Sequence, residues 1–143
     1  ALDGIPDQLP LPTDRPRPAQ TSHHGATTDF HIPPHLHQQL LTLARTHNAT
    51  LFMVLHAAYA TLLTRHGAGT DIPIGTPIAG RTDNNLDHLI GFFVNTLVIR
   101  TNTSNNPTFT QLLNTTRETT LHAYQHQDLP FEHLVDHLNP TRS

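Results

Sequence analysis

Residues 49–65 limit the possible folds of this chain more than any other segment. Their apolar side chains occupy almost every side of a helix, and such a helix is stable only when most of its faces are buried. His56 interrupts the apolar run, which is too short to span a bilayer. We therefore predict a central helix surrounded by the rest of a soluble domain. Its apolar residues are Leu51, Phe52, Met53, Val54, Leu55, Ala57, Ala58, Tyr59, Leu62 and Leu63.

The segments before this helix predict a linker, a strand and another helix. Residues 1–20 contain five prolines, which remove backbone donors and fix φ, so we expect an extended Pro-rich linker. Residues 27–32 are a short strand candidate that ends at a proline. In residues 34–46 apolar side chains recur with helical spacing, and Asn48 is a suitable N-cap for the central helix.

The second half of the chain alternates strands and helices. Residues 72–78 and 92–100 are rich in β-branched side chains, so both predict strands, and the second also contains aromatic residues. A short helix is expected between them at 85–90. Asn106 precedes a proline at the favoured first position of a helix that extends to Tyr124. One further short helix follows.

In chain order these elements are a strand, two helices, a strand, a helix, a strand and two helices. The order predicts the α/β class, as a two-layer sandwich in which helices cover one face of a small sheet. Such a layer buries a single sheet face and leaves the rest of the fold incomplete. We therefore expect further chain on both sides of this segment.

Composition excludes several functions. The formal net charge is −3 and the basic residues, all arginine, are scattered, so no patch suits nucleic acid or an anionic membrane surface. The absence of cysteine excludes disulfides, thiolate nucleophiles and cysteine-ligated zinc. Residues 1–20 do not resemble a signal peptide. We expect a cytoplasmic protein with neither a nucleic-acid nor a membrane partner.

The 13 histidines do not by themselves indicate a metal site. Histidine, threonine, asparagine, glutamine and proline are all abundant and are encoded largely by A and C bases, so nucleotide drift explains the whole set. His122 and His126, like His133 and His137, have the four-residue spacing that lets two imidazoles share a metal. No third ligand is evident, and we predict no functional metal site. A His-rich metal-binding module, testable by zinc titration, is kept as a further hypothesis.

Four segments, taken together, resemble the condensation domains of nonribosomal peptide synthetases. Residues 90–96 read IGFFVNT, with Arg100 four positions later, and residues 126–132 read HQDLPFE. Residues 75–81 read GTPIAGR, and residues 11–18 read LPTDRPRP. All four occur in the family's order and spacing, and the resemblance covers essentially the whole chain.

The resemblance implies an incomplete lobe with a chloramphenicol-acetyltransferase-like fold. Residues 1–20 would link two such lobes, and residues 21–143 would form part of the C-terminal one. Family members hold a tunnel between the lobes, where an acceptor amine attacks a donor thioester and an amide forms. Both substrates arrive on the 4′-phosphopantetheine arms of carrier domains, so no cofactor is expected to bind directly. The implied partners are the N-terminal lobe, the donor and acceptor carrier domains and a neighbouring adenylation domain.

The family's catalytic HHxxxDG motif lies in the N-terminal lobe, so we predict no catalytic residue and no activity for this chain alone. His23 and His24 imitate the motif, but Asp29 is one residue too far and Phe30 stands in place of glycine. A slip of one residue misplaces both the base and the group that orients it. We therefore interpret both histidines as surface residues entering a strand.

Asn95 and Arg100 are the polar residues of the best predicted strand. Alternation places Asn95 among apolar side chains on one face, where a buried amide needs a partner. It either lines the tunnel and binds a pantetheine or substrate carbonyl, or makes a structural hydrogen bond to the backbone. Arg100 is predicted to be a salt-bridge partner rather than a substrate contact.

By resemblance, residues 75–81 contribute to the tunnel floor, so Gly75, Thr76, Pro77 and Arg81 are tunnel candidates together with Thr96. Glycine and proline let the backbone turn tightly or approach a ligand. Arg81 is interpreted as a surface ion-pair residue, with the pantetheine phosphate as the alternative partner.

Asp128, Pro130 and Glu132 have the residue types of a helix start, where Asp caps and Glu favours the positive end of the dipole. The resemblance adds that this motif lies near the segment that bridges the lobes. Gln127 and Asp128 would then stabilise the closed tunnel. We predict a structural role for all four residues rather than a catalytic one.

The leading hypothesis is thus part of a condensation domain that joins carrier-bound aminoacyl or peptidyl thioesters. A non-catalytic relative that recruits a tailoring enzyme is the alternative, and the state of the HHxxxDG motif would discriminate the two. An epimerising or cyclising relative is a third hypothesis, although the HQDLPFE segment argues against epimerisation.

Overall fold

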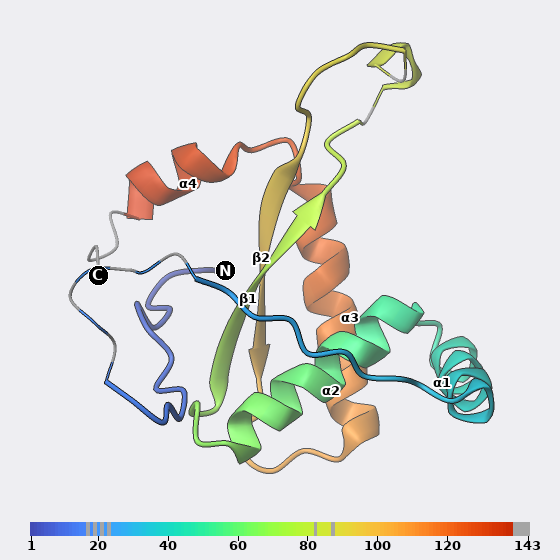
Figure 1. The fold of residues 1–143 in the computed structure, drawn as a ribbon. Coiled ribbons are helices and arrows are strands. Elements are labelled where there is room, and N and C mark those ends of the chain that lie inside the picture. The colour runs from blue at the N-terminus through green and yellow to red at the C-terminus, as the bar shows by residue number, and fades with distance from the viewer. Residues whose placement is uncertain are drawn as a thin grey trace.

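The computed structural model describes residues 1–16, 18, 20, 22, 24–81, 83–86 and 88–138. Among them the chain forms a mixed α/β arrangement of four α-helices, a 3₁₀ turn and one antiparallel pair of strands (Figure 1). The coarse fold class predicted from the sequence is confirmed. In order, the elements are α1 (Pro34–Thr46), α2 (Leu51–Arg65), β1 (Asp71–Ile78), η1 (Asn84–Leu86), β2 (Asn95–Asn102), α3 (Phe109–Gln125) and α4 (Phe131–Leu138).

Two reciprocal caps begin the long helices. At the start of α2 the Thr50 hydroxyl accepts a hydrogen bond from the Met53 N–H at 3.2 Å, and the Met53 sulfur accepts from the Thr50 N–H at 3.4 Å. At the start of α3 the Thr108 hydroxyl accepts from the Gln111 N–H at 3.3 Å, and Gln111 Oε1 accepts from the Thr108 N–H at 2.9 Å. Each cap satisfies backbone donors that a helix leaves unpaired.

The predicted caps Asn48 and Asn106 are therefore wrong. Both residues have positive φ angles, 51° and 49°, so they form left-handed turns upstream of each helix. Asparagine tolerates this conformation better than other non-glycine residues. The sequence offered two suitable cap residues at each helix, and the turn decides which of them is used.

The sheet separates a buried face from a half-open one. In the β1–β2 register Ile72 lies opposite Thr101 and Ile74 opposite Ile99, and successive side chains of a strand point to opposite faces. Ile72, Ile99 and Thr101 are almost fully buried. The next residues along each strand belong to the other face, where Arg100 is only half-buried.

Pro73 and Pro77 lie four residues apart in β1, so both occupy the same alternating set of strand positions. Proline lacks the N–H that a ladder needs, and strands tolerate it where that N–H would point away from the partner. Since β1 pairs with β2 along one edge, we infer that the nitrogen atoms of both prolines point toward the other, outer edge of β1.

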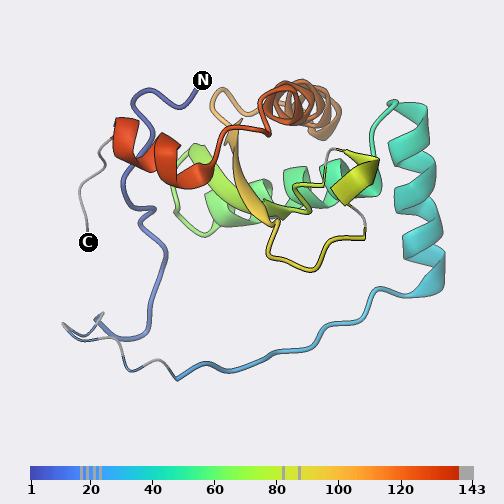
Figure 2. The ribbon, with the colours of Figure 1, turned by 90° about the horizontal axis from the view of Figure 1, so that it is seen from above.

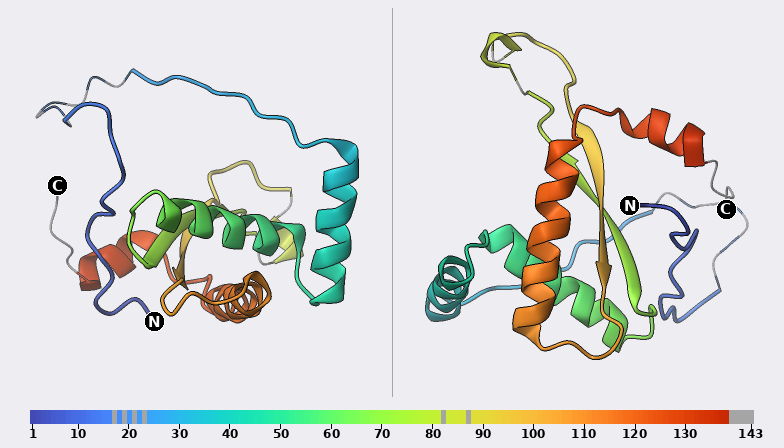
Figure 3. Two further views of the ribbon diagram at one scale, coloured as in Figure 1. Left: turned by 90° about the horizontal axis from the view of Figure 1, so that it is seen from below. Right: turned by 180° about the vertical axis from the view of Figure 1, so that it is seen from behind.

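Helices α2 and α3 cover the buried face. α3 runs along β2, and α2 packs against both α3 and β1 (Figure 3). One core cluster joins the first two helices to α3 through Ala44, Met53, Val54 and Leu113. A second cluster joins α2 to β1 through Ala60, Ala68 and Ile72, and Leu9 of the N-terminal segment packs against it.

Three sequence predictions are corrected by the strands. Residues 27–32 are extended but pair with no strand in the described part of the chain. The strand expected at 92–100 runs instead over Asn95–Asn102, and Phe92 is 88% exposed. The helix expected at 85–90 is only the short turn η1. Residues 27–32 would need a partner strand to form a β-strand, and the described residues contain none for them. The residues just before Asn95 belong instead to a loop that extends beyond the sheet (Figure 1).

The central helix α2 is also less buried than predicted. Its inner side is buried, with Val54, Ala57 and Ala60 fully inaccessible. Its outer side carries Phe52, Leu55, Tyr59 and Leu62, which are between 37% and 51% exposed. Within the described part of the chain, the apolar side chains of α2 therefore have a packing partner on only one side of the helix.

His56 generates a prediction about pH. Its imidazole is 5% exposed, Nδ1 lies 3.4 Å from the Thr101 hydroxyl, and Nε2 has no partner among the described residues. Burial lowers the pKa of His56. The unfolded chain, with a histidine pKa of about 6.5, therefore binds a proton more readily than the folded one, and stability falls as the pH drops below that value.

We expect His56→Leu to reduce this dependence on pH. The melting temperatures of both proteins, measured by circular dichroism at pH 7.5 and pH 5.5, should differ less between the two conditions in the variant. Equal acid sensitivity of the two proteins would show that the buried imidazole does not control it.

Candidate functional site

A groove of about 790 Å³ lies over β2, between the N-terminal segment, α3 and α4. A second hollow of about 420 Å³ shares part of its lining and continues it toward residues 4–7. The floor is the half-open face of β2, and the walls are mainly apolar. The groove is lined by Ala1, Leu2, Asp3, Thr96, Leu97, Val98, Arg100, Glu118, Thr119, His122, Ala123, His126, Leu129, Leu134 and Leu138.

Asn95 ties the start of β2 to the turn between α3 and α4. Its Nδ2 donates hydrogen bonds to the carbonyls of Gln127 at 2.8 Å and Leu129 at 2.9 Å. Its Oδ1 accepts from the Phe131 N–H at 3.0 Å and from the Thr96 N–H at 2.8 Å. The carboxamide thus bonds to backbone groups on both sides, which is the second of the two alternatives raised by the sequence.

The same contacts correct the predicted cap of α4. The helix begins at Phe131, and the acceptor for its first N–H is Asn95 of the neighbouring strand. Asp128 lies too early in the turn for the role expected of it. Pro130 immediately precedes the helix, and Glu132 stands in its first turn, where a negative charge is favourable.

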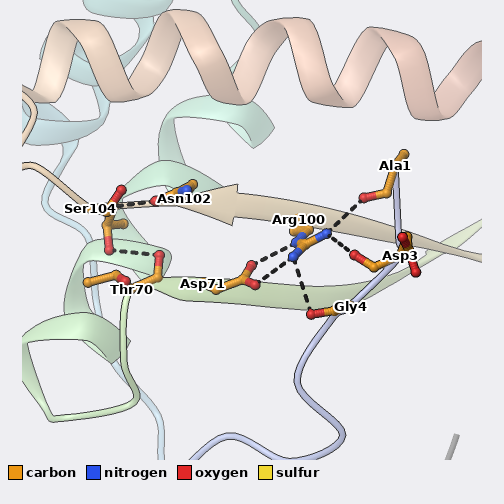
Figure 4. Close-up of polar contacts among 9 residues, drawn as sticks. Ala1, Asp3, Gly4, Thr70, Asp71, Arg100, Asn102 and Ser104 are labelled. Carbon is orange, nitrogen blue, oxygen red and sulfur yellow. Dashed lines mark hydrogen bonds and ion pairs between the residues drawn. The ribbon is translucent and has the colours of Figure 1, made fainter.

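Arg100 connects the floor of the groove to the N-terminal segment (Figure 4). Its Nε and Nη2 donate to the two carboxylate oxygens of Asp71, each at 2.8 Å. Nη1 donates to the carbonyls of Asp3 at 2.8 Å and Ala1 at 3.1 Å. The hydrogen bond from Arg100 lowers the pKa of the Asp71 carboxyl. The structure therefore shows the salt bridge that the sequence predicted for Arg100.

Arg81 braces the loop between β1 and β2. It donates to the carbonyl of Leu86 and, at 2.9 Å, to that of Leu89. Its guanidinium also lies 4.2 Å from the centre of the Phe93 ring, a favourable cation–π contact. Gly80 has a φ of 61°, and a Cβ there would collide with the Phe93 carbonyl. These contacts connect the first residues after β1 to described residues 86–93 of the same loop.

The remaining tunnel candidates lie on or beside the floor. Thr96 lines the groove, as Arg100 does. Gly75 and Pro77 lie opposite Val98 and Thr96 in the register, so they share its face. Thr76 lies opposite the buried Leu97 and therefore belongs to the other face. A Cβ at Gly75 would meet the Thr96 methyl group at an ordinary distance of 3.5 Å.

The sequence reasoning did not identify several groove residues. Glu118 and His122 of α3 and His126, which immediately follows the helix, line one wall. Their spacing of four residues was the available signal. The imidazole rings of the two histidines lie 4.8 Å apart, and His126 Nδ1 is 3.0 Å from the His122 carbonyl. In the described part of the chain, no three His, Cys, Asp or Glu side chains are grouped as metal ligands.

Two further observations concern earlier expectations. Among the described helices none is long and apolar enough to cross a membrane. Of the two histidines that imitate HHxxxDG, His24 is exposed and His23 lies outside the described residues.

The comparisons with known proteins point to one class. The chain is 60% identical, over 99% of its length, to a probable non-canonical nonribosomal peptide synthetase, CymA, from Salinispora arenicola (strain CNS-205). It is 58% identical, again over 99% of its length, to a dimodular nonribosomal peptide synthase from Bacillus subtilis (strain 168). The chain spans only 2% and 6% of these relatives.

Solved structures resemble the whole described fold. The crystal structure of the X-domain from teicoplanin biosynthesis superposes with a TM-score of 0.94 at 36% identity, covering 99% of this chain and 32% of that one. The X-domain in complex with OxyB gives a TM-score of 0.93 at 35% identity, covering 99% of this chain and 31% of that one.

Fold, groove and relatives together define a segment of a nonribosomal peptide synthetase domain. The family profile described as "Condensation domain" matches residues 1–143. The chain belongs to the condensation-domain family.

Asn95→Asp tests the contacts of the carboxamide. The variant loses both donated bonds and places a carboxylate against two carbonyl oxygens, so we expect it to be less stable by about 1–3 kcal/mol, measured by urea unfolding. Asn102→Asp on the same strand is the matched control, because Asn102 Oδ1 only accepts a bond, from the Ser104 N–H at 2.8 Å. A loss of similar size in both variants would argue against the role of the donated bonds.

Arg100→Lys tests the clamp on the N-terminal segment. Lysine cannot form the two-pronged bond to Asp71 and reach the backbone carbonyls at once. Because the ion pair is partly exposed, we expect a loss of only about 1 kcal/mol, with no change for Arg45→Lys at the exposed end of α1. Coincident unfolding curves for Arg100→Lys and Arg45→Lys would contradict this expectation.

Proposed function

We propose that residues 1–143 form part of the C-terminal lobe of a condensation domain, and that the groove over β2 is one wall of its substrate tunnel. The lobe would have the chloramphenicol-acetyltransferase-like fold, with residues 1–20 leading into it from the N-terminal lobe. The observation that supports this proposal is that Asn95, in the family motif at residues 90–96, hydrogen-bonds to the backbone of the second motif at residues 126–132. Its partners there are Gln127, Leu129 and Phe131. The two motifs thereby meet at one end of a groove whose floor is β2, the strand that begins with the last two residues of the first motif.

The proposed reaction joins two carrier-bound substrates. The amine of the acceptor attacks the carbonyl carbon of the donor thioester, so that a C–N bond forms, the C–S bond breaks and the pantetheine sulfur leaves as a thiol after taking up a proton. The histidine that handles the amine proton would come from the N-terminal lobe. Residues 1–143 supply binding, and we expect no peptide-bond formation from them alone.

The groove suits this task chemically. Its leucine side chains and Val98 on the floor would help to exclude water from a thioester, which favours transfer to an amine over hydrolysis. Thr96 would offer a polar group to the pantetheine arm. Gly75, Thr76 and Pro77 of β1, with Arg81 in the loop that follows, would contribute to the tunnel floor nearby. Arg100, Gln127, Asp128, Pro130 and Glu132 would hold the wall in place. The partners in this proposal are the N-terminal lobe, two carrier domains and an adenylation domain, in the cytoplasm.

The similarity to the X-domain supports a second candidate function. That domain is seen in a complex with OxyB, so a platform that recruits a tailoring enzyme is compatible with the same fold. The HQDLPFE segment argues against an epimerising relative, whereas the platform and a cyclising relative differ from a condensing domain in the HHxxxDG motif of the N-terminal lobe. An intact HHxxxDG motif in the N-terminal lobe would favour condensation, and a degraded one the platform.

Val98→Phe tests the groove in the intact condensation domain. The added ring would fill the floor, and displacement of a reacting group costs up to about a hundredfold in rate. We expect at least a tenfold slower appearance of the condensed product by mass spectrometry, with carrier loading unchanged. Thr115→Phe on the exposed face of α3 is the control and should leave the rate unaltered. Equal rates for both variants would remove the groove from the reaction.

A further inference from the structure

The polar side chains that line the groove over β2 divide unequally into hydrogen-bond donors and acceptors. The N-terminal segment, α3 and α4 come together around this side of β2 (Figure 2). Because the walls are mainly apolar, the few polar atoms decide which end group a ligand can bring into the groove. The donors and acceptors that the protein has not used itself are those available to a ligand.

The donors of the groove are already engaged. The Arg100 guanidinium has five N–H groups, and five acceptors lie within hydrogen-bond distance of them. These are the two carboxylate oxygens of Asp71 and three backbone carbonyls of residues 1–4. The Thr119 hydroxyl donates to the Thr115 carbonyl at 3.0 Å. An anionic group, such as the phosphate of a pantetheine arm, would have to displace these contacts in order to bind here.

Acceptors, in contrast, remain available on the α3 wall. Glu118 is exposed, and among the described residues its carboxylate forms no ion pair. His126 Nδ1 lies 3.0 Å from the His122 carbonyl. A carbonyl only accepts, so Nδ1 carries the proton and Nε2 of the neutral ring is an acceptor. Asp3 adds a second carboxylate to the lining, although its charge already acts on Arg100.

We propose that the groove selects an aliphatic chain that ends in a cation, such as the side chain of a basic amino acid, and rejects an anionic chain of the same length. The methylene groups would pack against Val98 and the leucine side chains, and the ammonium would donate to Glu118 and to His126 Nε2. Glu118 is then the specificity-determining residue. The inference rests on the proposed function in treating the groove as a place where a substrate binds.

The balance of charge in the lining favours this occupant. The positive charge of Arg100 is offset by Asp71, with which it forms an ion pair at 2.8 Å. Glu118 and Asp3 therefore leave the lining negative, and a second anion would be repelled. Because Glu118 is exposed, its pairing with an ammonium is screened by solvent. We expect it to change affinity by about twofold to fivefold and not to abolish binding.

Three matched probes test the selection in the intact condensation domain without any reaction. Hexylamine, hexanol and hexanoate share one aliphatic chain and differ in the end group. We expect hexylamine to shift the methyl NMR signals of Val98 and Ala123, which line the groove, at the lowest concentration. Hexanol should bind about twofold to fivefold more weakly, and hexanoate more weakly still. Equal affinities for hexylamine and hexanol, tighter binding of hexanoate, or no shift with any probe would overturn the proposal.

Glu118→Gln tests the residue assigned to the selection. The variant removes the charge and keeps the size of the side chain, so the preference for hexylamine over hexanol should fall about twofold to fivefold. Asp136→Asn is the matched control, because Asp136 is exposed on α4 and does not line the groove. An unchanged preference in Glu118→Gln, or an equal loss in both variants, would contradict the assignment.

The same titrations separate this inference from the proposed function. A domain that binds the probes in the expected order but forms no peptide bond would refute the proposed function alone. A domain that forms peptide bonds and binds hexanoate as tightly as hexylamine would refute this inference alone.

Discussion

The carboxamide of Asn95 is the interaction on which the candidate site depends. It bonds to Gln127, Leu129 and Phe131, and those residues lead into α4, a wall of the groove that contributes no residue to the buried core. None of the described residues of α4 is fully buried. The orientation of α4 over β2 therefore depends on a few polar contacts at its start and on the apolar side chains that face the groove.

Arg100 performs a comparable task at the other side of the same floor. Its guanidinium binds a carboxylate on the neighbouring strand and backbone carbonyls of the N-terminal segment, so a single planar group joins three pieces of chain. Buried apolar packing unites α2, α3 and the sheet on one face, whereas hydrogen bonds position the segments on the other. The groove lies on the face where hydrogen bonds position the surrounding segments. Small displacements of those segments cost less energy than displacements within a packed core.

Local sequence predicted what local interactions decide. The helix at 34–46 follows from apolar spacing and the helix at 49–65 from its continuous apolar run. The family resemblance assigned Asn95 to the tunnel and Gln127 to the motif near the segment that bridges the lobes. The contact between Asn95 and residues 127–131 joins positions more than thirty apart, so it depends on how β2 and α3 pack. No periodicity in the sequence reveals such a contact.

Where prediction failed, the missing information was a partner or a local competition. The strand at 27–32 and the full burial of α2 were both inferred from correct patterns of apolar residues, yet each requires a surface that the described chain does not supply. At the helix starts, Asn48 competes with Thr50, and both residues suit a cap. The backbone geometry of the turn decides which of them caps the helix, and this geometry cannot be inferred from the residue types alone.

The two prolines of β1 have a consequence for how this protein behaves in a crowded solution. A sheet of two strands has exposed margins, and margins of this kind recruit strands from other molecules into aggregates. Pro73 and Pro77 have no backbone N–H. From the direction inferred for their nitrogen atoms, the outer edge of β1 therefore lacks two hydrogen-bond donors. Misdirected assembly along that side is thereby discouraged.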